Sequence, residues 1–247
     1  MSSNACLALL LDGPMQSWGH SSRFERRTTA LHPTRSGIMG LLAAALGIDK
    51  HHADEGGQLG RFAPLRVTTI TLPKRPARLK SQTKNSETPF LPIIRLEDYH
   101  TVTGIRRASG KVDENATVQT YRHYLLDARF GVLLEGPPAL LEEIAAALRN
   151  PKWGVWLGRK CCLPASPLLV KLSTDRSETW RELLTRAGYT GTEEIDRFDH
   201  ILEVPASEPG ADMIDDTPLG FGRPIGERHA PRWIRRVPKT TVKNPSA

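Results

Sequence analysis

Residues 10–47 read LLDGPMQSWGHSSRFERRTTALHPTRSGIMGLLAAALG, and they contain an apolar run, a basic loop and a second apolar segment, in that order. The first run, residues 6–11, predicts a buried strand because an Asp-Gly-Pro break ends it. A helix is predicted over residues 38–46, since capping hydroxyls lie in 33–36 and Gly47 occupies the C-terminal cap position. The chain therefore opens with a strand-loop-helix unit.

The loop of this unit is rich in arginines and hydroxyl residues and contains one tryptophan. The N-terminal amides of a helix point outward and its dipole favours anions, so a basic loop leading into a helix predicts phosphate binding. The alternative is a solvated basic loop without a ligand.

Length and composition set the broad class. The chain has 247 residues, 39% of them hydrophobic, which suffices for one elaborate domain or two small ones with a real core. No segment approaches the roughly 20 apolar residues of a membrane span, and the N-terminus has no positively charged leader. Three cysteines, two of them adjacent, fit a reducing compartment, so we expect a cytoplasmic protein.

The positive charge is concentrated in two segments. The net charge of the whole chain is +7, but residues 74–111 and residues 221–243 each have a net charge of +6. The remainder is therefore mildly acidic, at −5. Because each neutralised phosphate releases counterions, this segregation predicts contact with a polyanion at the two basic segments.

The order of the elements predicts the fold class. Strands are expected at residues 64–72, 117–124, 128–134, 153–157 and 167–172, with a second helix over 140–148. This βαββαβ order is that of a ferredoxin-like or RRM-like α+β domain. Residues 73–116 interrupt it, and because 44 residues are too many for an ordinary connection, we expect a projecting β-hairpin thumb there.

The last third of the chain is expected to form an extension. A helix over residues 178–187, a strand over 201–204 and a polar loop over 205–216 precede the basic tail. We therefore divide the chain into residues 1–172, the ferredoxin-like domain with its thumb, and a small β-rich C-terminal extension, residues 173–247, that packs on or extends the same domain.

Five motifs of the chain resemble one known family. They are residues 13–19 (GPMQSWG), 33–37 (PTRSG) leading into 40–42 (GLL), 98–102 (DYHTV), 119–125 (QTYRHYL) followed by Asp127-Ala128, and 157–160 (LGRK) ahead of Cys162. In this order they are similar to the CasD family of subunits of the type I-E CRISPR surveillance complex, Cascade, within the RAMP superfamily. They cover roughly the first two thirds of the chain.

The resemblance implies a non-catalytic, RNA-binding subunit of an antiviral ribonucleoprotein. Such a subunit binds and caps the 5′ handle of the guide crRNA, contacts the adjacent backbone subunit and the large subunit, and meets target DNA only through the complex. No cofactor and no metal are implied. Recognition of a single strand combines arginines and lysines on phosphates with bases stacked on aromatic rings.

The candidate RNA-binding residues come from three parts of the chain. The N-terminal loop supplies Gln16, Trp18, Arg23, Arg26, Arg27, Arg35 and Ser36. The thumb supplies Tyr99, His100, Arg106, Arg107 and Lys111. The strand and the turn that follow the thumb supply Gln119, Arg122, Arg159 and Lys160. Tyr121 and Tyr124 are expected to pack within a strand.

Two enzymatic alternatives remain open. A metal-independent endoribonuclease that processes CRISPR repeat RNA needs a base for the 2′-hydroxyl and an acid or cation for the leaving oxygen. The available groups are His100, His123, Tyr121, Tyr124 and Lys160. A metal enzyme would use Asp49, His51, His52 and Asp54, or the paired Cys161 and Cys162, but neither set has the spacing of a zinc site.

Overall fold

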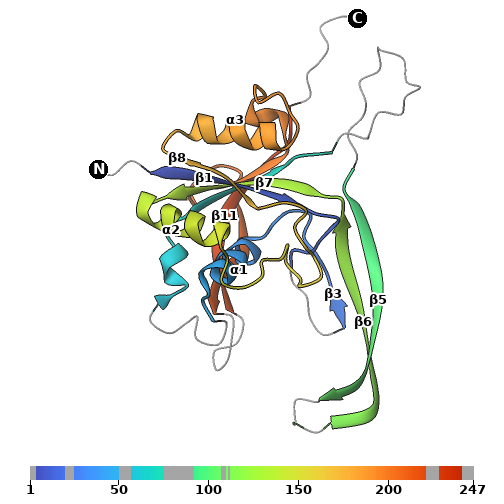
Figure 1. The fold of residues 1–247 in the computed structure, drawn as a ribbon. Helices are drawn as coiled ribbons and strands as arrows, with labels where there is room; N and C mark the ends of the chain where they lie inside the picture. Colours follow the sequence, from blue (N-terminus) through green and yellow to red (C-terminus); the bar gives the residue numbers. More distant parts are fainter. Residues whose placement is uncertain are drawn as a thin grey trace, which may run out of the picture.

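A computed structural model describes residues 4–19, 25–49, 57–74, 92–106, 110, 112–220 and 228–240. The fold is mixed α+β and mostly antiparallel: a seven-stranded sheet forms the body, and a smaller sheet built around a long hairpin projects from it (Figure 1). The elements of the body are β1 (Ala5–Asp12), α1 (Arg35–Leu46), β4 (Arg66–Thr71), β7 (Arg129–Gly136), α2 (Pro138–Arg149), β8 (Leu169–Ser173), α3 (Arg176–Arg186), β9 (His200–Glu203), β10 (Asp212–Gly220) and β11 (Arg228–Val237).

The strand order of the large sheet is β10-β11-β9-β4-β7-β1-β8. β1 lies between β7 and β8, and β4 pairs with the other edge of β7, all antiparallel. Along the chain, α1 follows β1 and α2 follows β7. The C-terminal strands continue the same sheet, because β9 pairs with β4.

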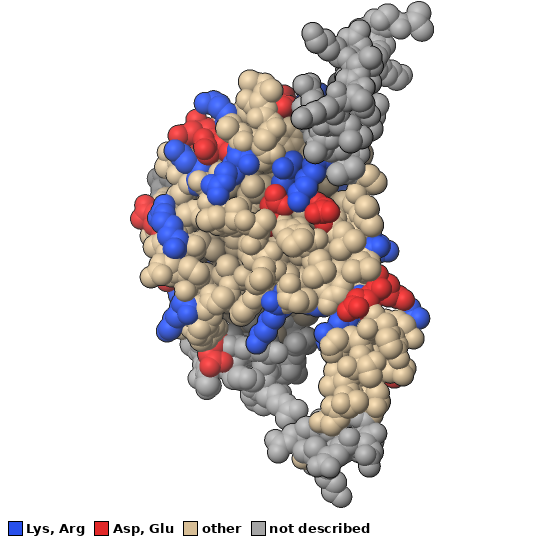
Figure 2. All heavy atoms as spheres, turned by 45° about the vertical axis from the view of Figure 1, so that its right-hand side comes forward, with Lys and Arg blue, Asp and Glu red and all other residues tan. Residues whose placement is uncertain are grey.

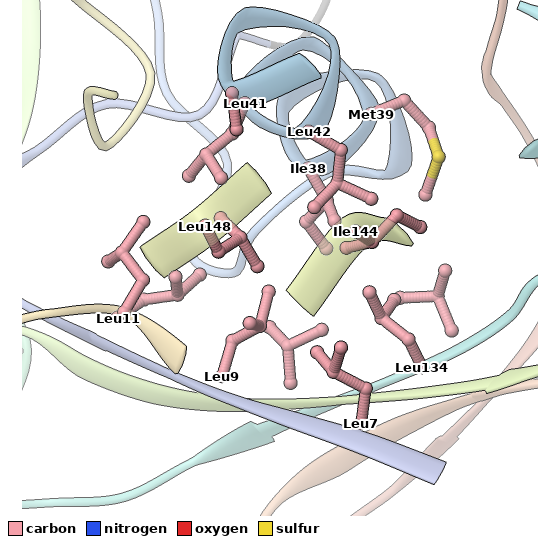
Figure 3. Packing of buried hydrophobic residues seen from close by; sticks show 14 of the residues in the cluster. Leu7, Leu9, Leu11, Ile38, Met39, Leu41, Leu42, Leu134, Ile144 and Leu148 are labelled. Carbon is pink, nitrogen blue, oxygen red and sulfur yellow. The ribbon is translucent and has the colours of Figure 1, made fainter. Parts of the chain in front are cut away.

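The apolar run of β1 is buried on both sides, which is why it lacks polar alternation. Leu7, Leu9 and Leu11 point toward α1 and α2, where they pack with side chains such as Ile38 and Ile144 (Figure 3). The intervening Cys6, Ala8 and Leu10 pack instead in a cluster with leucines of α3. The sheet is therefore a middle layer, with α1 and α2 on one face and α3 on the other.

Both predicted caps of α1 are confirmed. Thr34 is the N-cap, and its side chain accepts a hydrogen bond from the Gly37 amide at 3.2 Å. Gly47 adopts the left-handed conformation, with φ of 74°, and its amide bonds back to the last turn. The helix begins at Arg35, three residues before the predicted start.

The thumb prediction needs a correction of its boundaries. The hairpin consists of β5 (Ile94–Arg106) and β6 (Val112–Leu126), so the predicted strand at residues 117–124 is its second arm and not a strand of the body. Residues 75–91, also assigned to the thumb, lie outside the described residues. Two short strands, β2 (Met15–Gln16) and β3 (Arg26–Arg27), pair with β6 at the base of the hairpin.

Two further expectations are wrong. Residues 153–157 form no strand but an irregular segment, and the loop expected over 205–216 ends before Asp212, where β10 begins. In both places the chain lacks a clear period-2 pattern, so the sequence does not separate strand from loop.

In the described part of the chain the longest helices, α1 and α2, have 12 residues each, and none is suited to crossing a membrane.

Candidate nucleic-acid interface

The hairpin brings polar and aromatic side chains into rows. In its register Glu97 lies opposite His123, Tyr99 opposite Tyr121, and Thr101 opposite Gln119. Because alternate residues of paired strands share a face, these six side chains lie on one side of the hairpin, which we call the tyrosine face. Tyr99 is 52% exposed, and its ring meets that of Tyr121 edge-on, with centroids 5.5 Å apart.

Arg26 adds a cation to the tyrosine face. β3 runs parallel to β6 with Arg26 beside Tyr121, and the guanidinium lies 5.1 Å from the centre of that ring. Its side chain is 68% exposed and lies 3.8 Å from the Glu97 carboxylate, which also receives a hydrogen bond from His123 Nε2 at 2.6 Å. An exposed arginine beside one of two paired tyrosine rings offers a phosphate partner and a stacking surface together.

The opposite side of the hairpin has a different character, and we call it the apolar face. Ile94, Leu96 and Val102 lie on it and are 55%, 38% and 38% exposed. Arg27 and Arg122, which pair with each other in register, also lie on this side. His100 shares the face, and its Nδ1 is buried without a hydrogen-bond partner among the described residues.

Arg159 ties the interface to the body. Its guanidinium donates to the carbonyl oxygens of Arg27 at 2.8 Å and His123 at 3.3 Å, and it lies 4.8 Å from the centre of the Tyr124 ring. Lys160 is exposed, and its Nζ lies 5.7 Å from the centre of the Trp156 ring. Arg159 therefore holds β3 against β6 and positions Arg26 and Arg27.

Gly158 allows the turn that contains Arg159 to lie against the N-terminal loop at Ser17. Its φ is +94°, and a Cβ atom placed on it would lie 1.7 Å from the carbonyl oxygen of Ser17. Only glycine fits such a close backbone approach in this conformation. The amide of Ser17 in turn donates to the carbonyl oxygen of Leu157 at 3.0 Å.

Three predicted RNA-binding residues are inside the protein instead of on its surface. Gln16 and Trp18 are both 0% exposed. The amide of Gln16 donates to the carbonyl oxygens of Leu11 and Ala128 and accepts from the Trp18 indole at 3.1 Å. These two side chains therefore hold the N-terminal loop against the body, which corrects the expectation that they line an RNA path.

Arg35 is the third buried residue. It binds carboxylates of the protein where we predicted a bound phosphate. Its guanidinium pairs with Glu203 at 2.6 Å, and its backbone amide donates to Asp216 Oδ2 at 2.8 Å. Asp216 thus occupies the N-terminus of α1, where we expected an external anion. Ser36 is half-buried, with its hydroxyl 3.4 Å from that of Thr34.

The remaining predictions fall partly outside the described residues. Arg23, Arg107 and Lys111 lie there, and of Arg106 only the backbone is described. Sequence reasoning missed Tyr121 and Glu97 as members of the tyrosine face. The signal that could have found Tyr121 is the period of two in a strand over 117–123, which places Tyr121 on the same side as Gln119.

Three arginines of the C-terminal basic segment are ion-paired, whereas Lys239 of the same segment is exposed. Arg232 pairs with Asp216 and Glu203, Arg235 with Glu208, and Arg236 with Asp212. At these three arginines, carboxylates offset the positive charge on which the expectation of polyanion contact rests. Figure 2 likewise shows the lysines and arginines of one side in small groups, several of them beside carboxylates.

The paired cysteines are poor metal ligands. Their sulfur atoms lie 4.0 Å apart, and burial raises the pKa of Cys162 to about 12, so its thiol stays protonated at neutral pH. Among the described residues no group of three or more His, Cys, Asp or Glu side chains could hold a metal ion. His51, His52 and Asp54 are not among those residues.

Sequence comparisons match this chain to CRISPR-associated proteins. The family described as "CRISPR-associated protein (Cas_Cas5)" matches residues 6–232. The CRISPR system Cascade subunit CasD of Escherichia coli (strain K12) is 34% identical over 167 residues, which are 66% of this chain and 69% of that protein.

Solved structures agree with the sequence comparison. A chain of a CRISPR RNA-guided surveillance complex superposes with a TM-score of 0.69 and 31% identity, covering 95% of this chain and 90% of that chain. The crystal structure of a Cas protein superposes with a TM-score of 0.57 and 29% identity, covering 95% of both chains. The likeness therefore extends over nearly the whole chain.

Proposed function

Because this chain belongs to the Cas5 family of CRISPR-associated proteins, we propose that it is a non-catalytic RNA-binding subunit of a type I-E Cascade complex that caps the 5′ handle of the guide crRNA. Its partners are the crRNA, the adjacent backbone subunit and the large subunit, and target DNA is reached through the complex. The three free cysteines fit a cytoplasmic assembly. In this proposal β4-β7-β1-β8 with α1 and α2 form a ferredoxin-like RAMP core.

The tyrosine face is the observation that supports RNA binding most strongly. Three separate segments converge there: β3 supplies Arg26, the hairpin supplies Tyr99 and Tyr121, and the turn after Leu157 supplies Arg159 as the support. Single-stranded RNA is bound by such combinations of arginines for phosphates and rings for bases.

The two faces of the hairpin suggest two kinds of partner. The tyrosine face suits a nucleic acid, whereas the exposed aliphatic side chains of the apolar face suit a protein. We infer that the apolar face contacts the adjacent backbone subunit while the tyrosine face follows the RNA.

The arrangement of the acid-base residues supports a non-catalytic role. His100 and His123 lie on opposite faces of the hairpin, so they cannot act on one phosphodiester as a base and an acid. Tyr124 is buried, and burial raises the pKa of its hydroxyl. The endoribonuclease alternative therefore cannot use the two histidines as its acid-base pair.

The proposal is tested by binding of the full chain to a fluorescent 5′-handle RNA, a scrambled RNA and the matching DNA over a salt series. We expect preference for the handle, a steep decrease of affinity with salt and intact RNA after incubation without metal. Equal, weak binding of all three would overturn handle recognition, and specific cleavage that is lost in His123→Ala would replace it with the endoribonuclease.

A further inference from the structure

A cavity of about 350 Å³ lies between one end of the large sheet and the segment that precedes α1. Its walls come from β4, β7, β9, the end of β11 and the two residues Leu31 and His32. Cavities that bind small ligands measure roughly 300–1000 Å³, so this one suits a small molecule or one part of a larger one.

One buried hydroxyl in the wall lacks a partner. Thr69 is 4% exposed, and its Oγ1 makes no hydrogen bond to any described residue. A buried hydroxyl without a hydrogen bond is unfavourable, and a ligand with a polar edge would satisfy it. The neighbouring Thr71 also lines the cavity.

Two histidines add hydrogen-bond acceptors. Nδ1 of His32 lies 3.1 Å from the carbonyl oxygen of Pro33, and Nδ1 of His200 lies 2.8 Å from that of Phe198. Since a carbonyl oxygen only accepts, Nδ1 is the donor in each neutral ring and Nε2 is left as an acceptor. Burial lowers the pKa of His32, which favours its neutral form.

The lining is unsuited to a phosphate. Its cation, Arg236, pairs with Asp212, and the Asp199 carboxylate on the same wall would repel an anion. Much of the remaining wall is apolar and includes Leu31, Phe130 and Ile201. Apolar walls with several acceptors suit a flat, neutral heterocycle that donates hydrogen bonds.

The cavity is close to the candidate interface along the chain. Arg27 on β3 and Leu31 at the cavity are four residues apart, and a fully extended chain of that length spans at most about 14 Å. An RNA strand held at Arg26, the residue before Arg27, therefore passes near the cavity. Leu31 is 52% exposed.

We propose that this cavity holds one unstacked nucleobase with an amino group, that is adenine, cytosine or guanine, from the RNA strand bound at the tyrosine face. Thr69, His32 and His200 contact the polar edge of the base, and the apolar walls contact its ring. The RNA source of the base depends on the proposed function, whereas the capacity of the cavity for a nucleobase does not.

The cavity is tested first with free nucleosides and the full chain, by NMR of the His32 and His200 imidazole protons assigned through single substitutions. Adenosine, cytidine and guanosine should shift both signals saturably, and uridine should bind at least about threefold more weakly, since it has no amino group. Thr69→Val should weaken binding about three- to tenfold without lowering the melting temperature, because the lost hydroxyl has no partner. Absence of any shift, or equal shifts in Thr69→Val, would overturn the proposal.

The matched control is Thr68→Val, the same change at the preceding residue of β4, whose side chain points to the other side of the sheet. It should leave nucleoside binding unchanged, and a loss equal to that of Thr69→Val would count against the cavity.

A second experiment tests whether the base in the cavity comes from RNA. Handle RNAs that each lack one base are compared with the intact RNA, for the wild-type chain and for Thr69→Val. At one position the missing base should weaken binding to the wild-type chain but should not weaken binding to Thr69→Val any further. If nucleosides bind but no position behaves this way, the RNA source is wrong. If handle RNA does not bind at all while nucleosides do, the proposed function fails and the cavity stands.

Discussion

At the scale of single residues, the position of a polar side chain relative to the core decides its role. Arg26 and Arg35 are only nine residues apart, yet Arg26 is exposed beside a tyrosine ring and Arg35 is buried against Glu203. The sequence predicts both as RNA ligands because burial of an arginine depends on partners far away in the chain. Glu203 is 168 residues from Arg35, and no local pattern reveals that pair.

Arg26→Ala should weaken handle binding and make it less sensitive to salt. Loss of one phosphate contact on a single strand reduces the slope of log K against log salt by about 0.7. Fluorescence anisotropy over a salt series measures this slope. The control is Arg149→Ala, an exposed arginine at the end of α2, which should leave the slope as it is. An unchanged slope in Arg26→Ala would remove this residue from the RNA path.

His32 should make stability depend on pH. Burial lowers its pKa below the usual value of about 6.5, so the unfolded chain takes up a proton at a higher pH than the folded chain does. Its contribution to the free energy of unfolding is complete above about pH 6.5 and is lost as the pH falls through the lower folded pKa.

Urea unfolding between about pH 7 and pH 5 should therefore show a decline of stability that is shallower in His32→Asn. The exposed His229 provides the control, and His229→Asn should decline like the wild type. An equal decline in His32→Asn would assign the pH dependence to other groups.

At the scale of elements, features set by neighbouring residues were predictable and features set by pairing were not. The apolar run of β1 and the caps of α1 are local, and the structure has them where the sequence places them. The second arm of the hairpin is a strand in the prediction and in the structure. The prediction assigns it to the body, because the sequence of one strand does not show which strand it pairs with. Its tyrosine face follows only from that pairing.

Gly158 has the closest approach to a neighbouring backbone among the described glycines. Gly158→Ala requires a left-handed conformation and also brings Cβ against the Ser17 carbonyl, so it should lower the free energy of unfolding by more than about 1–3 kcal/mol. RNA affinity should fall as well, because the turn positions Arg159. Chemical denaturation and anisotropy measure the two effects.

Gly210→Ala separates strain from crowding. Gly210 has a φ of +75°, but a methyl group added to its Cα would meet no described atom within 4 Å. This substitution should therefore cost only about 1 kcal/mol and leave RNA affinity unchanged. Equal losses in both variants would mean that the contact with Ser17 relaxes freely.

At the scale of the whole molecule, a buried ionic network joins the N-terminal and C-terminal parts. Arg35, Glu203, Arg232 and Asp216 pair across α1, β9, β11 and β10, and their side chains are at most 16% exposed. The division at residue 172 stays a prediction, but both sides of it share this network and one sheet. The network also neutralises Arg232, one of the cations that give the tail its net charge.

Asp216→Ala should lower the free energy of unfolding by about 3–5 kcal/mol, because it leaves Arg232 buried with one partner fewer and removes the acceptor of the Arg35 amide at the start of α1. Thermal or urea unfolding measures the loss. Asp212→Ala, which breaks the exposed pair with Arg236, is the matched control and should cost less than about 1 kcal/mol. Similar losses in the two variants would contradict a structural role for the buried network.

The central claim is that RNA runs along the tyrosine face of the hairpin, and photo-crosslinking tests it most directly. Handle RNA containing 4-thiouridine, irradiated in complex with the full chain and digested, should yield crosslinked peptides that contain Arg26, Tyr99 or Tyr121. Crosslinks confined to α2 and α3, which lie on the body away from the hairpin, would contradict the claim (Figure 1).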